Sequence, residues 1–128
     1  MNILLILSLL IGVPYGYTQY SIAKIEKTHP PAGQFRTIDN IKMHYQISGS
    51  GPTVILLHAQ PSNQEQFNKL KDVLKNNYTV ISIDRPGMGY SESISEQSPK
   101  RLMQQARLIR GLVRELTNEK PIVVGHSY

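Results

Sequence analysis

The chain has 128 residues, of which 40% are hydrophobic and 18% are charged, and its formal net charge is +5. This length allows one small domain or part of a larger one, and this composition excludes a disordered chain, so we expect a packed core. Cysteine is absent, which excludes disulfides, thiolate metal sites and cysteine nucleophiles.

The N-terminal residues form an uncharged apolar run, ILLILSLLIGV, at residues 3–13. The run is too short to span a bilayer, which takes about 20 residues, although an extension to Tyr20 would marginally suffice. Its length is typical of a secretory signal, and Ser21 to Ala23 include small residues suited to signal peptidase. No Lys or Arg precedes it, however, and Pro14 is expected to break its helix. We predict that residues 1–23 are an export signal or an uncleaved membrane anchor, so that the protein is exported or membrane-anchored rather than cytoplasmic.

A short connecting segment follows at residues 24–33. Pro30 and Pro31 stiffen this segment and Gly33 ends it, which is typical of a linker. The folded domain is therefore predicted to cover residues 34–128.

The domain is predicted to begin with a β-hairpin. Its strands are FRTID and IKMHYQI, at residues 35–39 and 41–47, and they join at Asp39-Asn40. Apolar residues alternate with polar ones in the second strand, so we expect one face of the pair to be buried.

Three later segments are apolar almost throughout, which is typical of strands covered on both faces of a parallel sheet. They are TVILLHA, YTVISID and IVV, at residues 53–59, 78–84 and 122–124. We predict a helix in each interval, one at residues 63–75 and one from Ser98-Pro99 to Thr117. The order β-β-β-α-β-α-β predicts an α/β fold, in which an N-terminal hairpin precedes three parallel strands joined by crossover helices.

Each predicted helix has one apolar face. Ser62 and Glu65 suggest a capping box at the start of the first helix. The residues expected to be buried are Phe67, Leu70, Val73 and Leu74 in the first helix and Leu102, Ala106, Ile109, Val113 and Leu116 in the second.

The second helix also carries much of the positive charge, because Arg107, Arg110 and Arg114 share one face. The simplest interpretation is a solvated outer face. The alternative is attraction to anionic lipid, which would make the chain a membrane-tethered binding module without enzymatic activity. Nucleic acid is not an expected partner, because no aromatic or glycine-rich binding pattern accompanies the arginines.

Candidate site residues follow the three buried strands, because ligands of such sheets bind at the carboxyl ends of the strands. The three segments are HAQP, DRPGMG and GHSY, at residues 58–61, 84–89 and 125–128. In order and spacing they resemble the α/β-hydrolase fold family, from about residue 34 to residue 128. The resemblance covers the N-terminal half of that family's catalytic domain.

The resemblance implies a serine hydrolase that acts on a small acyl substrate, by default a carboxylic ester. Gly125, His126, Ser127 and Tyr128 match the start of the motif G-x-S-x-G, which makes Ser127 the expected nucleophile. The backbone N–H groups of Gln60 and Tyr128 are the expected oxyanion hole, and His58, Ala59, Gly125 and His126 the supporting loop and turn. No cofactor or metal is implied.

One residue of these loops departs from the family pattern, and two other pairs of residues allow an alternative interpretation. Ala59 stands where the family usually has glycine, and a positive φ there would strain alanine or distort the oxyanion hole. Gln60-Pro61 also resembles the haloalkane dehalogenase branch, but that branch needs an aspartate nucleophile. Asp84 and Arg85 follow the second buried strand and are either turn residues or pocket residues.

The histidines bear on how Ser127 would be activated. The family order is Ser, then Asp or Glu, then His, whereas His29, His44, His58 and His126 all precede Ser127. The acid and base are therefore expected outside this sequence, and a truncated, inactive product is the alternative to an enzyme. The family's strand order places the strand of His58 beside that of Ser127, which would allow His58 to substitute as base. The favoured interpretation is that His58 anchors its loop by hydrogen bonds. His126 is predicted to be a packing residue, and His44 a surface or satisfied core histidine.

Overall fold

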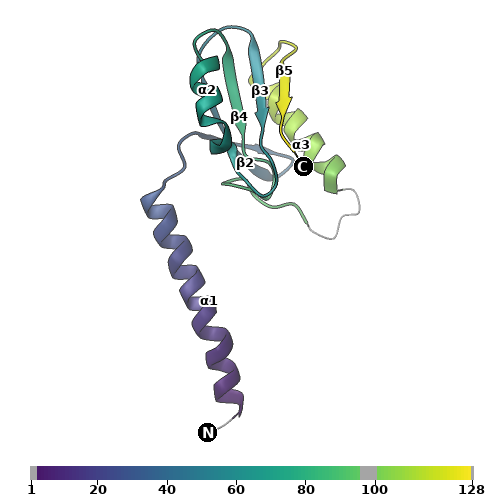
Figure 1. The fold of residues 1–128 in the computed structure, drawn as a ribbon. Coiled ribbons are helices and arrows are strands. Elements are labelled where there is room, and N and C mark those ends of the chain that lie inside the picture. The colour runs from purple at the N-terminus through teal and green to yellow at the C-terminus, as the bar shows by residue number, and fades with distance from the viewer. Residues whose placement is uncertain (1–2, 96–100, 128) are drawn as a thin grey trace. The chain divides into compact units, whose positions relative to one another are not determined.

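The structure is a computed structural model that describes residues 3–95 and 101–127. The chain divides into two units, Met1–Ala32 and Gly33–Tyr128. The first unit holds one helix, α1 (Ile3–Thr28), which passes through Pro14 and extends into the predicted linker (Figure 1). The predicted break at Pro14 is wrong, because proline removes a single backbone N–H donor and the helix continues on both sides of it. Within the described residues, no helix combines the length and apolar character that crossing a membrane requires.

The second unit contains a five-stranded sheet with the order β1-β2-β4-β3-β5. The strands are β1 (Gln34–Ile38), β2 (Ile41–Ser48), β3 (Thr53–Leu57), β4 (Thr79–Ile83) and β5 (Ile122–Gly125). β2 is antiparallel to both of its neighbours, whereas β3 is parallel to β4 and to β5. The predicted α/β architecture, a hairpin followed by three parallel strands, is confirmed.

The hairpin turn forms where the sequence predicts it. Asp39 and Asn40 have φ angles of 48° and 63°, so both central residues of the two-residue loop are left-handed. Asp and Asn tolerate this region best among residues with a side chain, and the resulting turn matches the twist of the flanking strands.

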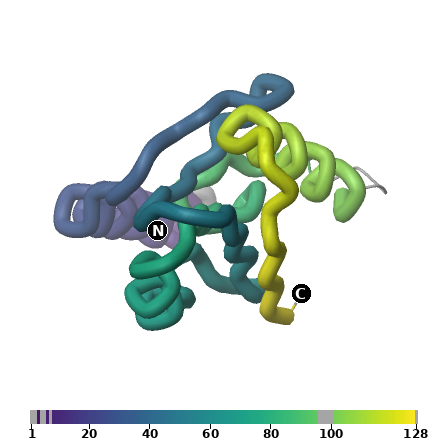
Figure 2. Tube along the Cα trace, turned by 90° about the horizontal axis from the view of Figure 1, so that it is seen from above, coloured from purple at the N-terminus to yellow at the C-terminus, as the bar shows by residue number. Residues whose placement is uncertain are grey.

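The helices cover both faces of the sheet. The 3₁₀ helix η1 (Gln64–Phe67) and helix α2 (Asn68–Leu74) lie on one face, and α3 (Arg101–Leu116) lies on the other (Figure 2). Successive residues of β3 point to opposite faces, so Val54 and Leu56 pack with Phe67, whereas Ile55 packs with Leu108 and Leu112. Two apolar clusters therefore hold the central strands.

The predicted helix at residues 63–75 starts with a 3₁₀ turn, and its cap differs from the prediction. Asn63, not Ser62, is the N-cap, and its side chain accepts the backbone N–H of Glu65 at 2.9 Å. Ser98 and Pro99, predicted to begin the second helix, lie outside the described residues.

The buried faces of both helices are narrower than predicted. Four residues predicted to be buried are exposed and do not belong to the core: Leu70, Val73, Leu102 and Ala106. α3 instead buries Gln105, Leu108 and Leu112. The polar residue Gln105 belongs to this buried stripe, and its side chain accepts a hydrogen bond from Arg85.

β5 is paired on one side only, with β3. Its residues Ile122 and Val123 are 55% and 59% exposed, although the sequence predicts a buried strand. The prediction of burial is wrong because, among the described residues, no second strand covers its outer edge. By contrast β3 and β4 are buried along nearly their whole length, as predicted.

Candidate active site

The loop after β3 and the turn after β5 lie side by side. The parallel register pairs Leu57 with Gly125, and the backbone N–H of His126 bonds to the Leu57 carbonyl at 3.1 Å. This bond extends the ladder beyond the end of β5. Residues 58–61, here called the β3 loop, are thus brought next to residues 125–127, here called the β5 turn.

Ser127 has a φ angle of 45° and an exposed side chain. A left-handed backbone costs a residue with a side chain about 1–2 kcal/mol, so it persists only where the surrounding chain requires it. A strand that ends in a sharp turn exposing a serine oxygen is the geometry expected of a nucleophile. Gly125 is not crowded, because a Cβ there would meet nothing within 4 Å among the described residues.

The β3 loop contains the predicted oxyanion donor, Gln60. Asp39, Asn40 and Ser127 are the non-glycine residues with positive φ among those described, so Ala59 carries no left-handed strain. The concern that alanine in place of glycine would distort the loop is therefore removed. The N–H of Ala59 is bonded to Gln66 Oε1 at 3.0 Å, so it is not free to donate to an oxyanion. Tyr128, the predicted second donor, lies outside the described residues.

His58 is buried, with 1% of its surface exposed, and both ring nitrogens are engaged. Nδ1 lies 2.8 Å from the Ala59 carbonyl, and Nε2 accepts the backbone N–H of Arg85 at 2.9 Å. This pair of contacts requires the neutral Nδ1–H tautomer. Burial lowers the pKa of His58, although the hydrogen bond to Ala59 and the charge of Asp84 act in the opposite direction. His58 thus anchors the β3 loop and has no free lone pair for a substrate proton.

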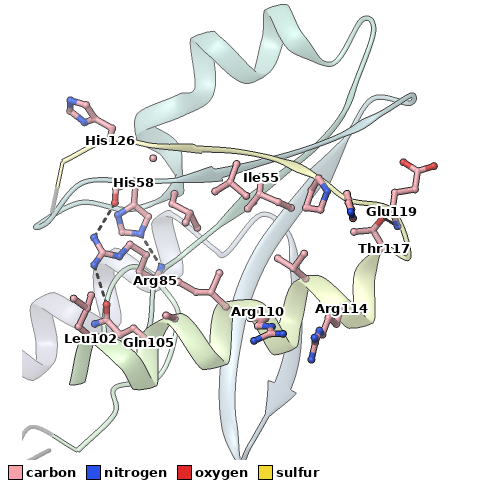
Figure 3. A pocket seen from close by; sticks show the side chains of 18 of the residues that line it. Ile55, His58, Arg85, Leu102, Gln105, Arg110, Arg114, Thr117, Glu119 and His126 are labelled. Carbon is pink, nitrogen blue, oxygen red and sulfur yellow. Dashed lines mark hydrogen bonds between the residues drawn. The ribbon is translucent and has the colours of Figure 1, made fainter. Parts of the chain in front are cut away.

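Arg85 joins the same network to α3. Its guanidinium donates to the His58 carbonyl at 3.2 Å and to Gln105 Oε1 at 3.0 Å, and the side chain is almost fully buried. Figure 3 shows this chain of contacts running from β3 to the helix. The sequence did not single out Gln105, and the only available signal was one polar residue beside an apolar helical stripe.

Asp84 is a structural acid. Its carboxylate accepts the backbone N–H of Gln64 at 2.7 Å and that of Tyr90 at 3.0 Å, and it binds His44 Nδ1 at 2.7 Å. Asp84 and His44 are each 1% exposed. His44 is therefore a core histidine and not a surface one, but it is only partly satisfied, because its Nε2 is buried without a hydrogen-bond partner among the described residues. Asp84 fixes η1 and the loop after β4.

A groove of about 840 Å³ runs between α3 and the sheet. Ser127 and Arg85 line it near the carboxyl ends of the strands, and its walls are largely apolar, including Ile109, Val113 and Val123. The exposed residues Arg110 and Arg114 border it. The ring of His126 points away from α3, and the residue is exposed, so the prediction that it is a packing residue is wrong. Within the described part of the chain, no cluster of three or more acidic or histidine side chains could hold a metal ion.

Comparison with known proteins places this arrangement among hydrolases. The family model described as alpha/beta hydrolase fold matches residues 52–128. A soluble epoxide hydrolase of Corynebacterium sp. (strain C12) is 35% identical over 91 residues, which is 71% of this chain and 31% of that protein. The 2-(acetamidomethylene)succinate hydrolase of Mesorhizobium japonicum is 32% identical over 90 residues, 70% of this chain and 32% of that protein.

Solved structures agree with this result. An epoxide hydrolase from Vigna radiata superposes with a TM-score of 0.66 at 27% identity, covering 73% of this chain and 32% of the other. The chain thus spans about a third of the length of the curated relatives that it matches.

Proposed function

We propose that this chain, which belongs to the α/β-hydrolase fold family, forms the N-terminal part of a serine hydrolase. In this proposal Ser127 is the nucleophile, and the substrate is a small acyl compound, by default a carboxylic ester. The observation that supports it most directly is the left-handed backbone of Ser127, at the turn after a parallel strand and beside the β3 loop.

The chemistry follows from the positions of the β3 loop and the β5 turn. Ser127 Oγ attacks the carbonyl carbon, its proton passes to a general base, and the carbonyl oxygen becomes an oxyanion. The backbone N–H groups of Gln60 and Tyr128 then stabilise this oxyanion, and one such donor contributes about 3 kcal/mol. The alcohol leaves with the proton, and water hydrolyses the acyl group from Ser127.

The general base must come from residues outside this sequence. His58 Nε2 is occupied by the N–H of Arg85, and His44 is bonded to the buried Asp84. His126 Nδ1 lies 2.6 Å from Gln66 Nε2 and the ring points away from α3. We therefore propose that the acid and the base are supplied by a further part of the polypeptide, and that residues 1–128 alone do not turn over substrate.

A serine at this turn favours acyl substrates over epoxides, although two of the relatives described above are epoxide hydrolases. Attack of a serine hydroxyl on an epoxide carbon would form an ether, which water does not cleave under mild conditions. Attack on an ester forms a new ester, which water cleaves. Turnover through Ser127 therefore requires an acyl group.

Active-site labelling tests the proposal. A fluorophosphonate probe should modify the complete gene product at Ser127, and Ser127→Ala should abolish the label. Ser50→Ala, which changes an exposed serine outside the site, should leave it unchanged. Labelling that persists in Ser127→Ala would exclude Ser127 as the nucleophile.

A further inference from the structure

Gln66 bridges the β3 loop and the β5 turn through both ends of its side-chain amide. Its Oε1 accepts the backbone N–H of Ala59 at 3.0 Å, and its Nε2 lies 2.6 Å from Nδ1 of His126. A backbone N–H can only donate, so the amide oxygen must face Ala59. The amide nitrogen then donates to His126, whose Nδ1 carries no proton in this arrangement.

The backbone that carries Gln66 is fixed on both sides. The N–H of Gln64 bonds to the buried Asp84 carboxylate at 2.7 Å, and the N–H of Gln66 bonds to the Asn63 carbonyl at 3.2 Å. Phe67, the next residue, is buried in the cluster with Val54 and Leu56. The Gln66 side chain therefore starts from a rigid point.

Each end of the bridge binds the residue just before a predicted catalytic group. Ala59 precedes Gln60, whose amide is the expected oxyanion donor, and His126 precedes Ser127. The backbone ladder between the two strands ends at the bond from His126 to Leu57. Beyond that bond, Gln66 makes the next connection between the β3 loop and the β5 turn.

We propose that Gln66 is a positioning residue, which sets the distance between the oxyanion donor and the nucleophile. This inference rests on the proposed function of Ser127 and adds a residue to that site. Misplacement of a reacting group by about 1 Å can slow catalysis about 100-fold, so a bridge at this point has a measurable effect on rate. Gln66 itself touches neither the substrate nor the oxyanion.

The test compares three variants in the complete gene product. Gln66→Leu removes both hydrogen bonds. Gln66→Glu keeps an acceptor for Ala59 and can accept from His126 when the ring proton moves to Nδ1. Asn76→Leu makes a matched polar-to-leucine change at an exposed position away from the site.

We expect Gln66→Leu to slow the reaction of Ser127 with a fluorophosphonate by about tenfold or more. The kcat for a p-nitrophenyl ester should fall in the same proportion, while KM and the melting temperature remain close to those of the wild type. Gln66→Glu should restore most of the rate, and Asn76→Leu should have no effect. If the wild type reacts at Ser127 and Gln66→Leu reacts equally fast, the positioning role is overturned and the role of Ser127 stands.

If the wild type does not react at all, the proposed function fails, and two readouts that need no activity decide the role of Gln66. Gln66→Leu should accelerate hydrogen exchange of the Ala59 amide and change the ¹⁵N shift of His126 Nδ1, relative to Asn76→Leu. Both changes support the bridge. Unchanged exchange and an unchanged shift overturn it.

Discussion

The imidazole of His58 accepts the backbone N–H of Arg85 at 2.9 Å, so a side chain from the end of β3 caps the end of β4. The guanidinium of Arg85 returns a hydrogen bond to the His58 carbonyl at 3.2 Å. This reciprocal pair fixes the start of the β3 loop. It also requires a neutral ring, which makes the pair sensitive to protonation.

The stability of the fold should therefore depend on the titration of His58. Burial lowers the folded-state pKa of His58 below its ordinary value of 6.5. Well above pH 6.5 the ring is neutral in both the folded and the unfolded chain, so His58 contributes its full share to the free energy of unfolding. As the pH falls from about 6.5 through the lowered folded-state pKa, the unfolded chain binds the proton first, and stability is lost. Urea unfolding of the complete gene product, measured from about pH 8 to about pH 5, should show this decline.

The control for this prediction replaces the ring. His58→Asn should flatten the decline, and it should lower the free energy of unfolding at neutral pH by about 1–3 kcal/mol, because the N–H of Arg85 loses its acceptor. His29→Asn changes a histidine with an exposed side chain in the first unit and should leave the decline intact. An equally steep decline in His58→Asn would assign the pH dependence to other groups.

Asp84→Asn should destabilise the domain strongly. The Asp84 carboxylate now binds three hydrogen-bond donors, from Gln64, Tyr90 and His44. An asparagine amide has only one acceptor oxygen, and its NH₂ group would face at least one of these donors. We expect a loss of about 2–4 kcal/mol in the free energy of unfolding of the complete gene product, measured by urea titration. Asp72→Asn alters an exposed carboxylate that pairs with Lys75 and should have little effect. Equal losses in the two variants would contradict a structural role for Asp84.

Periodicity and turn chemistry predict the central part of this molecule from sequence. The strands β2, β3 and β4 and the serine after β5 all lie where local physical rules put them. The expected alternation of burial in β2 fails, however, because His44 is buried and Ile47 is exposed. Side-chain bridges between distant segments are not predictable in this way. Gln66 and Gln105 become important only through the residues that the fold brings to them, Ala59, His126 and Arg85.

The predicted burial of β5 illustrates the same limit. The apolar sequence of Ile122 to Val124 indicates that these side chains are suited to burial. Whether they are buried depends on the strands and helices that surround the strand. β3 is the one partner that β5 has among the described residues. Composition therefore predicted the strand correctly and its exposure incorrectly.

Strain at Ser127 should be measurable as a difference between two inactive variants. Both Ser127→Gly and Ser127→Ala remove the nucleophile, but only glycine adopts a φ of 45° without steric cost. In the complete gene product, Ser127→Gly should therefore be more stable than Ser127→Ala by about 1 kcal/mol in urea unfolding. The same pair of substitutions at Ser50, which is not among the residues of positive φ, should not favour glycine. Equal stability of the two Ser127 variants would indicate that the turn relaxes when the hydroxyl is removed.

The free edge of β5 should make the 128-residue chain associate with itself. In the described part of the chain, the outer backbone edge of β5 pairs with no strand, and this edge and the exposed side chains of Ile122 and Val123 form a template for pairing with another strand. Val123→Lys should interrupt such pairing and raise the fraction of soluble monomer in sedimentation velocity, because a charge on an edge strand opposes addition of a second strand. Val73→Lys adds the same charge at an exposed position of α2, which offers no strand edge. If both variants improve solubility equally, net charge rather than the β5 edge controls association. If the wild-type chain melts cooperatively as a soluble monomer, it does not associate, and the prediction is wrong.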